Sequence, residues 1–210
     1  DGASTDGTAE IIRSYAPRLA YWHSRPDGGV ASAFNAGLAQ ARGDWLVFLN
    51  ADDFFIDATV VEQMVPYLVR RPRADVVYGQ VEIIPSDTGG PPFPFGRLLG
   101  QPWSWRTFRM YNIIPHQGAF TNRRYVARMG NFDENCTIAV DYDYYLRGGP
   151  NLQAVFVPRL ISKMRLGGLS NRHHVRSWQE YRRAQVKNRA LSPWAADLNY
   201  FYRILSYYGR

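Results

Sequence analysis

The sequence lacks cysteine pairs and long apolar runs. Its 210 residues include one cysteine, Cys136, so no internal disulfide can form, and nothing in the sequence argues for an oxidising compartment. No apolar run reaches the roughly 18 residues that a membrane-spanning helix needs. Charged residues make up only 20% and hydrophobic residues 46%, a balance that excludes global disorder and fibrous repeats and can fill the core of one domain.

Aromatic side chains and positive charges are, by contrast, in excess. Aromatic residues make up 15% of the chain, a surplus typical of interfaces and of sites that stack rings. The net charge of +7 is unevenly distributed, because residues 1–87 hold 12 acids and 7 bases whereas residues 88–210 hold 6 acids and 18 bases. Nucleic acid, an anionic membrane surface and a phosphorylated substrate are therefore candidate partners of the basic half.

The first hundred residues alternate between helix and strand patterns. Capping residues and apolar spacing predict helices over 9–15, 30–41 and 58–69. Apolar runs predict strands over 19–23, 45–49 and 75–78, of which 45–49 has the pattern of a buried parallel strand. This alternation predicts an α/β fold built around a mostly parallel sheet.

The pattern loosens after residue 84. Residues 85–100 are rich in proline and glycine and predict a connection or a lid. The remaining strands are predicted over 118–121, 154–158 and 161–166, and the remaining helices over 125–129, 142–147, 175–189 and 193–208. The last helix has a clear start, because Ser192 can cap it and Pro193 suits the first helical position.

One strand pattern ends in the polar segment Asn50-Ala51-Asp52-Asp53. Ligands of open parallel sheets bind outside the carboxyl ends of the strands. Adjacent aspartates repel each other unless a cation offsets their charge, and magnesium and manganese prefer oxygen ligands that bridge to substrate phosphates. Asp52 and Asp53 therefore indicate a metal and phosphate site, although the same two residues would also serve as caps for the following helix.

Two other segments carry candidate functional side chains. Residues 1–8 combine small residues with a following helix N-terminus, which suits either an anionic ligand or an ordinary capped turn. Asp141 and Asp143 lie among apolar residues at the start of a helix, where burial would raise the pKa of a carboxyl group and make it a general base. Because Asp143 can also pair with Arg147 at i,i+4, Asp141 is the better candidate base.

Seven segments occur in one order along residues 1 to about 170. They are Asp-Gly-x-Ser-Thr-Asp-Gly-Thr at 1–8, Pro-Asp-x-Gly and Ala-Phe-Asn-Ala-Gly within 26–37, Ala-Arg-Gly-Asp-Trp at 41–45, Phe-Leu-Asn-Ala-Asp-Asp at 48–53, His-Gln at 116–117, Gly-x-Phe-Asp-Glu at 130–134 and Asp-Tyr-Asp-x-x-Leu-Arg at 141–147. Together they resemble family 2 glycosyltransferases of the GT-A fold, inverting enzymes that use nucleotide-sugar donors. The resemblance implies a three-layer αβα domain over residues 1–170, followed by a basic and aromatic helical extension over residues 171–210.

The resemblance also implies roles for individual residues. Asp141 matches the general base that deprotonates the acceptor hydroxyl, and Asp52 matches the aspartate that helps to bind a divalent metal, Mn²⁺ or Mg²⁺, on the donor diphosphate. The residues that it implies for binding the nucleotide sugar are Asp1, Asp27, Asn35, Asp53, His116, Gln117 and Arg165. Arg165 begins the segment 165–170, which resembles the flexible loop that closes the site in this family.

The sequence departs from the family pattern at three places. Asn50 replaces the usual first aspartate of the Asp-x-Asp motif, which lowers the charge at the metal site, and Val140 replaces the glutamate that precedes the base. The chain starts at Asp1, within what reads as a loop, so we expect an N-terminally truncated chain without the family's first strand. The nucleotide pocket would then lack one wall.

The chemistry implied by the resemblance is a single inverting displacement. The metal and nearby hydrogen-bond donors would neutralise the charge of the departing nucleoside diphosphate. Asp141 would take the proton of the acceptor oxygen as that oxygen attacks the anomeric carbon. The implied acceptor is a glycan or a polyisoprenoid-linked sugar, in polysaccharide or cell-envelope biosynthesis.

The basic C-terminal segment suggests further partners. Residues 159–189 hold nine bases and one acid, Glu180, and the helix predicted there presents either a solvated face or a contact with anionic lipid. We expect the aromatic helix over 193–208 to pack on the domain or on a second copy of the chain, with an interfacial membrane contact as the alternative. The expected location is cytoplasmic, and peripheral at the inner face of the membrane if the lipid contact forms.

Two other functions compete with this prediction. A GT-A-like nucleotidyltransferase would share the fold, but the sequence shows no glycine-rich pyrophosphate loop carrying Lys or Arg. A nucleic-acid-binding module would explain the net charge of +7 but not the carboxylates of Asp52, Asp53, Asp141 and Asp143, which would repel phosphate without a metal. We therefore do not expect nucleic acid as a partner.

Overall fold

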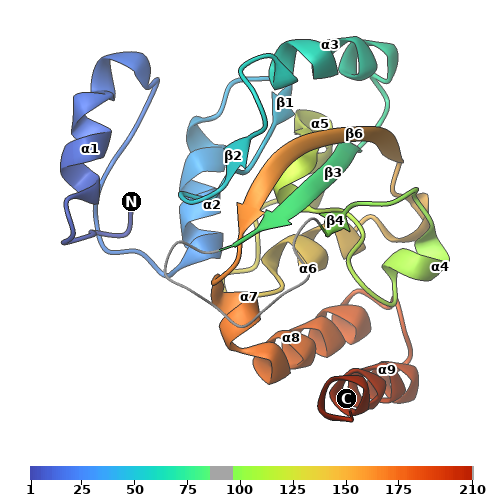
Figure 1. Cartoon of the computed structure of the whole chain (residues 1–210). Coiled ribbons are helices and arrows are strands. Elements are labelled where there is room, and N and C mark those ends of the chain that lie inside the picture. The colour runs from blue at the N-terminus through green and yellow to red at the C-terminus, as the bar shows by residue number, and fades with distance from the viewer. Residues whose placement is uncertain (86–96, 210) are drawn as a thin grey trace.

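The chain folds around a mixed six-stranded sheet, shown in a computed structural model that describes residues 1–85 and 97–209 (Figure 1). The strands follow the order β1-β5-β3-β6-β2, and β4 pairs with the second half of β3. The strands are β1 (Trp45–Leu46), β2 (Phe54–Phe55), β3 (Val76–Ile84), β4 (Leu98–Leu99), β5 (Ala119–Asn122) and β6 (Ala154–Arg165). The helices are α1 (Thr8–Ser14), α2 (Val30–Gln40), α3 (Val60–Arg70), α4 (Trp105–Phe108), α5 (Arg123–Met129), α6 (Val140–Leu146), α7 (Leu169–Arg172), α8 (His174–Lys187) and α9 (Pro193–Tyr208).

The two longest strands, β3 and β6, run parallel through the middle of the sheet. Val76, Val77 and Val81 of β3 are completely buried, which is expected of a strand covered on both faces. Between them lies Gly79, where a Cβ atom would stand 2.5 Å from Ile161 Cγ1 and 2.6 Å from the carbonyl oxygen of Arg159. The register of the pair shifts at this point, so the close approach of β6 requires a residue without a side chain.

The prediction of a mostly parallel sheet is wrong for the pairings of the described residues. Only β3 and β6 pair in parallel, whereas β5 and β4 run antiparallel to β3, β1 antiparallel to β5, and β2 antiparallel to β6. The expected strand over 45–49 is reduced to the two residues of β1, and residues 19–23 form no strand in the described part. Apolar runs indicate that a segment is extended, but they do not reveal which neighbour it pairs with or in which direction.

The predicted helices agree closely with the structure. The helix over 193–208 coincides with α9, and the helix over 175–189 corresponds to α8. The two strands expected over 154–158 and 161–166 form one strand, β6, which continues through Pro158. Most of the predicted connection over 85–100 lies outside the described residues.

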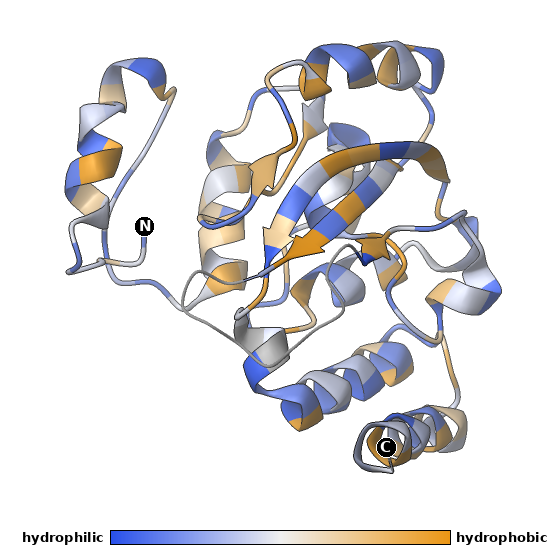
Figure 2. Ribbon diagram, viewed as in Figure 1, coloured by the Kyte–Doolittle hydropathy of each residue, from blue (hydrophilic) through white to orange (hydrophobic). Residues whose placement is uncertain are grey.

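Two hydrophobic clusters hold the sheet between helices. Val60, Met64 and Leu68 recur every four residues along α3 and bury one face of that helix against β3, β5 and β6. The second, larger cluster packs Phe108, Tyr125 and the aromatic residues of α6 against Val76 and Tyr78 of β3 and Ala119 of β5. Figure 2 shows apolar residues alternating with polar ones along β3. Full burial of one such side chain contributes about 1.5–3 kcal/mol.

The chain ends differ in how they pack. We call residues 1–28 the N-terminal arm; its helix α1 has no buried residue and stands apart from the sheet in Figure 1. In α9, by contrast, one side packs on the domain, because Asn199 and Arg203 both donate to the carbonyl of Met110. The other side is exposed and carries apolar residues, namely Trp194, Leu198, Phe201, Tyr202, Leu205 and Tyr208. No helix of the described residues is both long and apolar enough to cross a membrane.

Candidate active site

The polar segment between β1 and β2 folds into a turn that buries Asp53. The backbone N–H of Asp53 donates to the carbonyl of Asn50 (3.1 Å), and only 7% of Asp53 is exposed. Its carboxylate accepts from the side chain of Asn50 (3.0 Å) and from the backbone N–H of Arg165 (3.2 Å) at the end of β6. Burial raises the pKa of Asp53 above its usual range, and the charge of Asp52 adds to this, although hydrogen bonds oppose it.

The neighbouring Asp52 is exposed, and its carboxylate accepts no hydrogen bond from the described residues. No three His, Cys, Asp or Glu side chains of the described residues cluster closely enough to enclose a metal ion. Magnesium and manganese, however, need only one or two carboxylates when substrate phosphates supply the remaining oxygen ligands. The open carboxylate of Asp52 therefore fits a divalent metal that is shared with a diphosphate.

His116 and Gln117 lie in a short 3₁₀ turn, His116–Gly118, before β5. Gln117 is buried, and its carbonyl oxygen accepts from the hydroxyl of Ser162 in β6 (2.9 Å), which anchors the turn to the sheet. The ring of His116 lies between two polar side chains, with Nε2 3.2 Å from Asn50 Nδ2 and Nδ1 3.2 Å from Asp141 Oδ2. The turn thus joins the Asp53 segment to α6.

Asp141 occupies the first turn of α6, and its side chain is 17% exposed. Oδ2 accepts from Asn112 (2.9 Å) and faces His116, while Oδ1 accepts from the backbone N–H of Tyr142 (2.8 Å). Three surrounding groups therefore orient the carboxylate, and Oδ1 retains a free acceptor position. Asp143, two residues further along α6, is buried. It pairs with Arg147 (3.0 Å), as its i,i+4 spacing predicted.

One line of hydrogen-bonded side chains connects these residues: Asp53, Asn50, His116, Asp141 and Asn112. We call it the central network. Of the predicted site residues, the central network contains Asp53, His116 and Asp141 and contacts Arg165 through its backbone N–H. Asp52 borders it, because its charge acts on Asp53. Behind His116 the ring of Phe34 lies 6.0 Å away and packs on Phe48, so aromatic rings support the network from α2.

Asp1 and Asp27 lie elsewhere, in the N-terminal arm. Asp1 accepts hydrogen bonds from Ser4 and Ser24, and Asp27 accepts from the backbone N–H of Gly29 (2.8 Å) at the start of α2. A Cβ atom on Gly2 would lie 3.5 Å from the Asp27 carboxylate, so the two predicted residues belong to adjoining loops. Beside them is a cavity of about 340 Å³.

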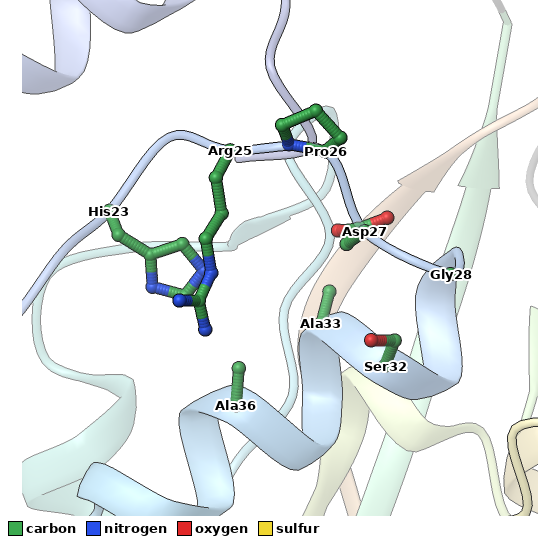
Figure 3. A pocket seen from close by; sticks show the side chains of 8 residues that line it. All are labelled: His23, Arg25, Pro26, Asp27, Gly28, Ser32, Ala33 and Ala36. Atoms are coloured by element: carbon green, nitrogen blue, oxygen red, sulfur yellow. The ribbon is translucent and has the colours of Figure 1, made fainter.

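This cavity lies between the arm and α2. Figure 3 shows the side chains of His23 and Arg25 reaching from the arm toward α2, with Asp27 close to the helix start. The lining thus offers an imidazole, a guanidinium and a carboxylate. These groups can form hydrogen bonds and ion pairs with a polar ligand, while the nucleotide-binding role predicted for Asp27 stays a prediction.

Asn35 has no hydrogen bond to the central network among the described residues and is not one of the residues that line the cavity. Its Oδ1 accepts from the backbone N–H of Phe132 (2.8 Å), and its Nδ2 donates to the carbonyl of Phe132 (3.1 Å) and to Glu134 (2.9 Å). The side-chain amide thereby links α2 to the segment 130–134. The geometry assigns Asn35 this linking contact, while its predicted contact with the nucleotide stays a prediction.

The sequence reasoning missed two residues that orient Asp141. Asn112 donates directly to it, and no pattern in the sequence marked that residue. Glu180 of α8 is buried and accepts from the backbone N–H groups of Thr137, Ile138 and Ala139, immediately before α6. The signal for Glu180 was present, because it is the single acid among nine bases in residues 159–189.

The environment of Glu180 keeps it ionised. Burial alone would raise the pKa of this carboxyl group, but the hydrogen bonds from residues 137–139 outweigh burial and hold the pKa below its usual range. A negative charge at the N-terminus of α6 also interacts favourably with the helix dipole. α8 therefore stabilises the turn of backbone that presents Asp141.

Comparison with known proteins defines the class. The family model Glycosyl transferase family 2 matches residues 1–129, so the chain belongs to family 2 of the glycosyltransferases. This match confirms the predicted family. An uncharacterized glycosyltransferase of Mycobacterium tuberculosis is 34% identical over 155 residues, which cover 70% of this chain and 54% of the relative. A PGL/p-HBAD biosynthesis glycosyltransferase of Mycobacterium bovis is 30% identical over 178 residues, 81% of this chain and 66% of the relative. The chain thus spans between about half and two thirds of the length of these relatives.

Solved structures show the same fold. Residues 1–349 of Staphylococcus aureus TarS, in complex with UDP-GlcNAc, superimpose with a TM-score of 0.65 and 15% identity over 98% of this chain and 62% of that TarS fragment. A mannosyltransferase of Pyrobaculum calidifontis, in complex with GDP-Man and Mn²⁺, gives a TM-score of 0.63 and 18% identity over 98% of this chain and 64% of that protein. At these identities the likeness concerns the fold, which agrees with the GT-A-type prediction apart from the strand directions corrected above.

Proposed function

We propose that this chain transfers a sugar from a nucleoside diphosphate sugar to an acceptor hydroxyl, with inversion at the anomeric carbon. The observation that carries the proposal is the central network, which connects Asp53, beside the open carboxylate of Asp52, to Asp141. The donor class rests on membership of family 2 and on the UDP-GlcNAc and GDP-Man bound by the structural neighbours. In this proposal residues 1–170 form the layered catalytic domain and residues 171–210 its helical extension.

The proposed reaction is one displacement. The acceptor oxygen forms a bond to the anomeric carbon while the bond from that carbon to the diphosphate breaks, and the electron pair leaves with the nucleoside diphosphate. Asp141 takes the acceptor proton, and Oδ1 is suited to this because, among the described residues, it accepts a hydrogen bond only from Tyr142. His116 and Asn112 hold the carboxylate through Oδ2 and so orient the base.

Asp52 is the residue that would hold the divalent metal, together with phosphate oxygens of the donor. When bound, Mn²⁺ or Mg²⁺ would offset the negative charge of the diphosphate. The buried Asp53 stabilises this segment, because its carboxylate accepts hydrogen bonds from the side chain of Asn50 and from the backbone N–H of Arg165. In the N-terminal arm, Asp1 and Asp27 contribute the nucleotide-binding groups beside the cavity.

For the acceptor we propose a glycan or a polyisoprenoid-linked sugar. The exposed apolar side of α9 supports a partner with an apolar surface, either the lipid of such an acceptor in its membrane or a second copy of the chain. Sedimentation of the protein with phosphatidylglycerol vesicles tests the lipid contact. The sedimentation coefficient of the protein alone tests the dimer.

The decisive experiment separates donor binding from transfer. Isothermal calorimetry with Mn²⁺ and a panel of nucleoside diphosphate sugars, beginning with UDP-GlcNAc and GDP-Man, should identify a donor. The variant Asp141→Asn should then bind this donor with unchanged affinity and lose about 10²–10⁴-fold in transfer rate, because it cannot accept the proton. The variant Asp44→Asn, an equally conservative change at an exposed carboxylate, serves as the matched control.

Two results would contradict the proposal. If every nucleoside diphosphate sugar fails to bind, the chain is not a nucleotide-sugar-dependent enzyme by itself. If Asp141→Asn transfers sugar at the rate of the Asp44→Asn control, Asp141 is not the base.

A further inference from the structure

One nitrogen atom lies at the centre of the central network. Asn50 Nδ2 stands 3.0 Å from Asp53 Oδ2 and 3.2 Å from His116 Nε2. An amide nitrogen carries two hydrogens and no free lone pair for accepting, so it can donate to two partners at once. Asn50 thus has the hydrogens needed for both contacts and nothing to offer a third donor.

The carboxylate decides how the amide is turned. Asn50 turns its NH₂ group, and not its oxygen, toward Asp53, because Nδ2 donates to Asp53 Oδ2 at 3.0 Å. The same NH₂ group then faces His116 Nε2. A hydrogen on Nε2 would point at the hydrogens of the amide, so Nε2 must be the unprotonated nitrogen of the ring.

The remaining ring proton is placed by elimination. A neutral imidazole with an unprotonated Nε2 carries its proton on Nδ1. Nδ1 lies 3.2 Å from Asp141 Oδ2, an oxygen that can accept. His116 therefore donates a hydrogen bond to the proposed base and brings no positive charge to it.

We propose that Asn50 is a positioning residue that holds His116 as the neutral Nδ1–H tautomer, and thereby gives Asp141 a neutral hydrogen-bond donor on Oδ2. The role of Asp141 in this statement rests on the proposed function. An aspartate at position 50, the residue that the family motif has there, would accept a hydrogen from Nε2 and would favour the doubly protonated, charged ring. Asn50 in place of that aspartate thus changes the group beside the base as well as the charge near Asp52.

The surroundings of His116 agree with a neutral ring. The titratable groups that face it are Asp141 in α6 and, beyond Asn50, Asp53, while the ring of Phe34 in α2 lies on another side at 6.0 Å between centroids. The side chain of His116 is 19% exposed, so its contacts are with protein groups more than with solvent. Asp141 is the one carboxylate in direct contact with the ring among the described residues.

The test reads the protonation of each ring nitrogen directly. Long-range ¹H–¹⁵N spectra of the full chain labelled with ¹⁵N-histidine distinguish protonated from unprotonated ring nitrogens, without donor or metal. The chain has four histidines, and the variant His116→Gln identifies the signal of His116 by its loss. At neutral pH we expect a protonated Nδ1 and an unprotonated Nε2. A protonated Nε2 in the wild-type chain would overturn the proposal, whether or not any variant folds.

Three variants show whether Asn50 is responsible. Asn50→Asp should protonate Nε2 as well. Asn50→Leu takes away the N–H donor that faces Nε2 while Nδ1 still faces Asp141 Oδ2, so Nε2 should become protonated at a higher pH than in the wild type. Asn151→Asp, at an exposed asparagine outside the central network, should leave the His116 signals unchanged. If His116 keeps the wild-type pattern in both Asn50 variants, Asn50 does not control the ring and the proposal fails.

The result is independent of the proposed function. A neutral Nδ1–H ring together with full transfer activity of Asp141→Asn would refute the role of the base but retain the tautomer. A protonated Nε2 together with an inactive Asp141→Asn would refute the tautomer but retain the role of Asp141 as the base.

Discussion

The central network and the N-terminal arm both present predicted carboxylates, but the fold holds them very differently. Asp141 is held by Asn112 and His116, which precede it by 29 and 25 residues, and its helix is capped by Glu180 from α8. Asp1 is held by Ser4 and Ser24, both within the arm, whose helix buries no residue. The proposed base is therefore oriented by long-range contacts before any ligand arrives, whereas the arm depends on local contacts. Three predictions test this difference, ordered by the size of the expected effect.

The largest effect is expected at Glu180. In Glu180→Gln the amide oxygen can keep the three backbone N–H contacts, but the charge is lost and the NH₂ group replaces the oxygen that accepts from the Thr137 hydroxyl and faces Arg176, so the free energy of unfolding should fall by about 2–3 kcal/mol. Urea denaturation at neutral pH measures this change. Glu10→Gln, at an exposed residue of α1, is the matched control and should unfold like the wild type.

The same pair of proteins gives a pH test. Folding lowers the pKa of Glu180, so its contribution is complete above the ordinary pKa of glutamate and is lost as the pH falls through the folded value. The difference in stability between wild type and Glu180→Gln should therefore shrink in acid. A difference that grows in acid would contradict the assignment.

A smaller effect is expected at Lys187, which joins α8 to Asp133 and to the buried Asp143. A hydrogen bond from Lys187 is the main cause that lowers the pKa of Asp133 to about 2. In Lys187→Met this pKa should rise toward the usual value of aspartate, and stability should fall by about 1–2 kcal/mol, since Arg147 still pairs with Asp143. NMR titration of the Asp133 carboxyl group measures the first change and thermal unfolding the second.

The exposed pair of Arg13 and Glu10 supplies the control for Lys187. Arg13→Met removes an ion pair of 3.9 Å between largely exposed side chains and should leave the unfolding temperature unchanged. Equal losses from Lys187→Met and Arg13→Met would mean that α8 is held no more firmly than the arm.

The smallest effect on stability, but a clear one on binding, is expected at Asp1. Asp1→Asn should change the free energy of unfolding by less than about 0.5 kcal/mol, because its contacts lie near the surface. Loss of a charged hydrogen-bond acceptor should nevertheless weaken nucleoside diphosphate binding about tenfold, measured by calorimetry. Asp6→Asn, at another exposed aspartate of the arm, should bind like the wild type. Equal affinities of Asp1→Asn and wild type would remove Asp1 from the nucleotide site.

The sequence predicted the elements of the fold better than their pairing. Ser192 and Pro193 mark the start of α9 because capping and proline geometry are local properties of the chain. The direction of β5 beside β3 is not local, since it depends on how residues more than 40 positions apart meet. The antiparallel pairings therefore could not be read from apolar runs.

The site shows the same division. The segment around Asp53 was recognisable as a polar run at the end of an apolar strand pattern, and the segment around Asp141 as two carboxylates among apolar residues at the start of a helix. Their connection through His116 was not, because hydrogen bonds between residues 25 and 66 positions apart leave no periodic trace. The sequence marked Glu180 only because it is the single acid among the nine bases of residues 159–189.

The contact between Glu180 and residues 137–139 also sets an order for synthesis. Thr137 and Glu180 are separated by 43 residues, so the backbone before Asp141 leaves the ribosome well before the carboxylate that it needs. Until α8 has emerged, three N–H groups at the start of α6 have no such partner. The proposed base can therefore be assembled only late in translation, after the segments for β6 and the first half of α8 have been made.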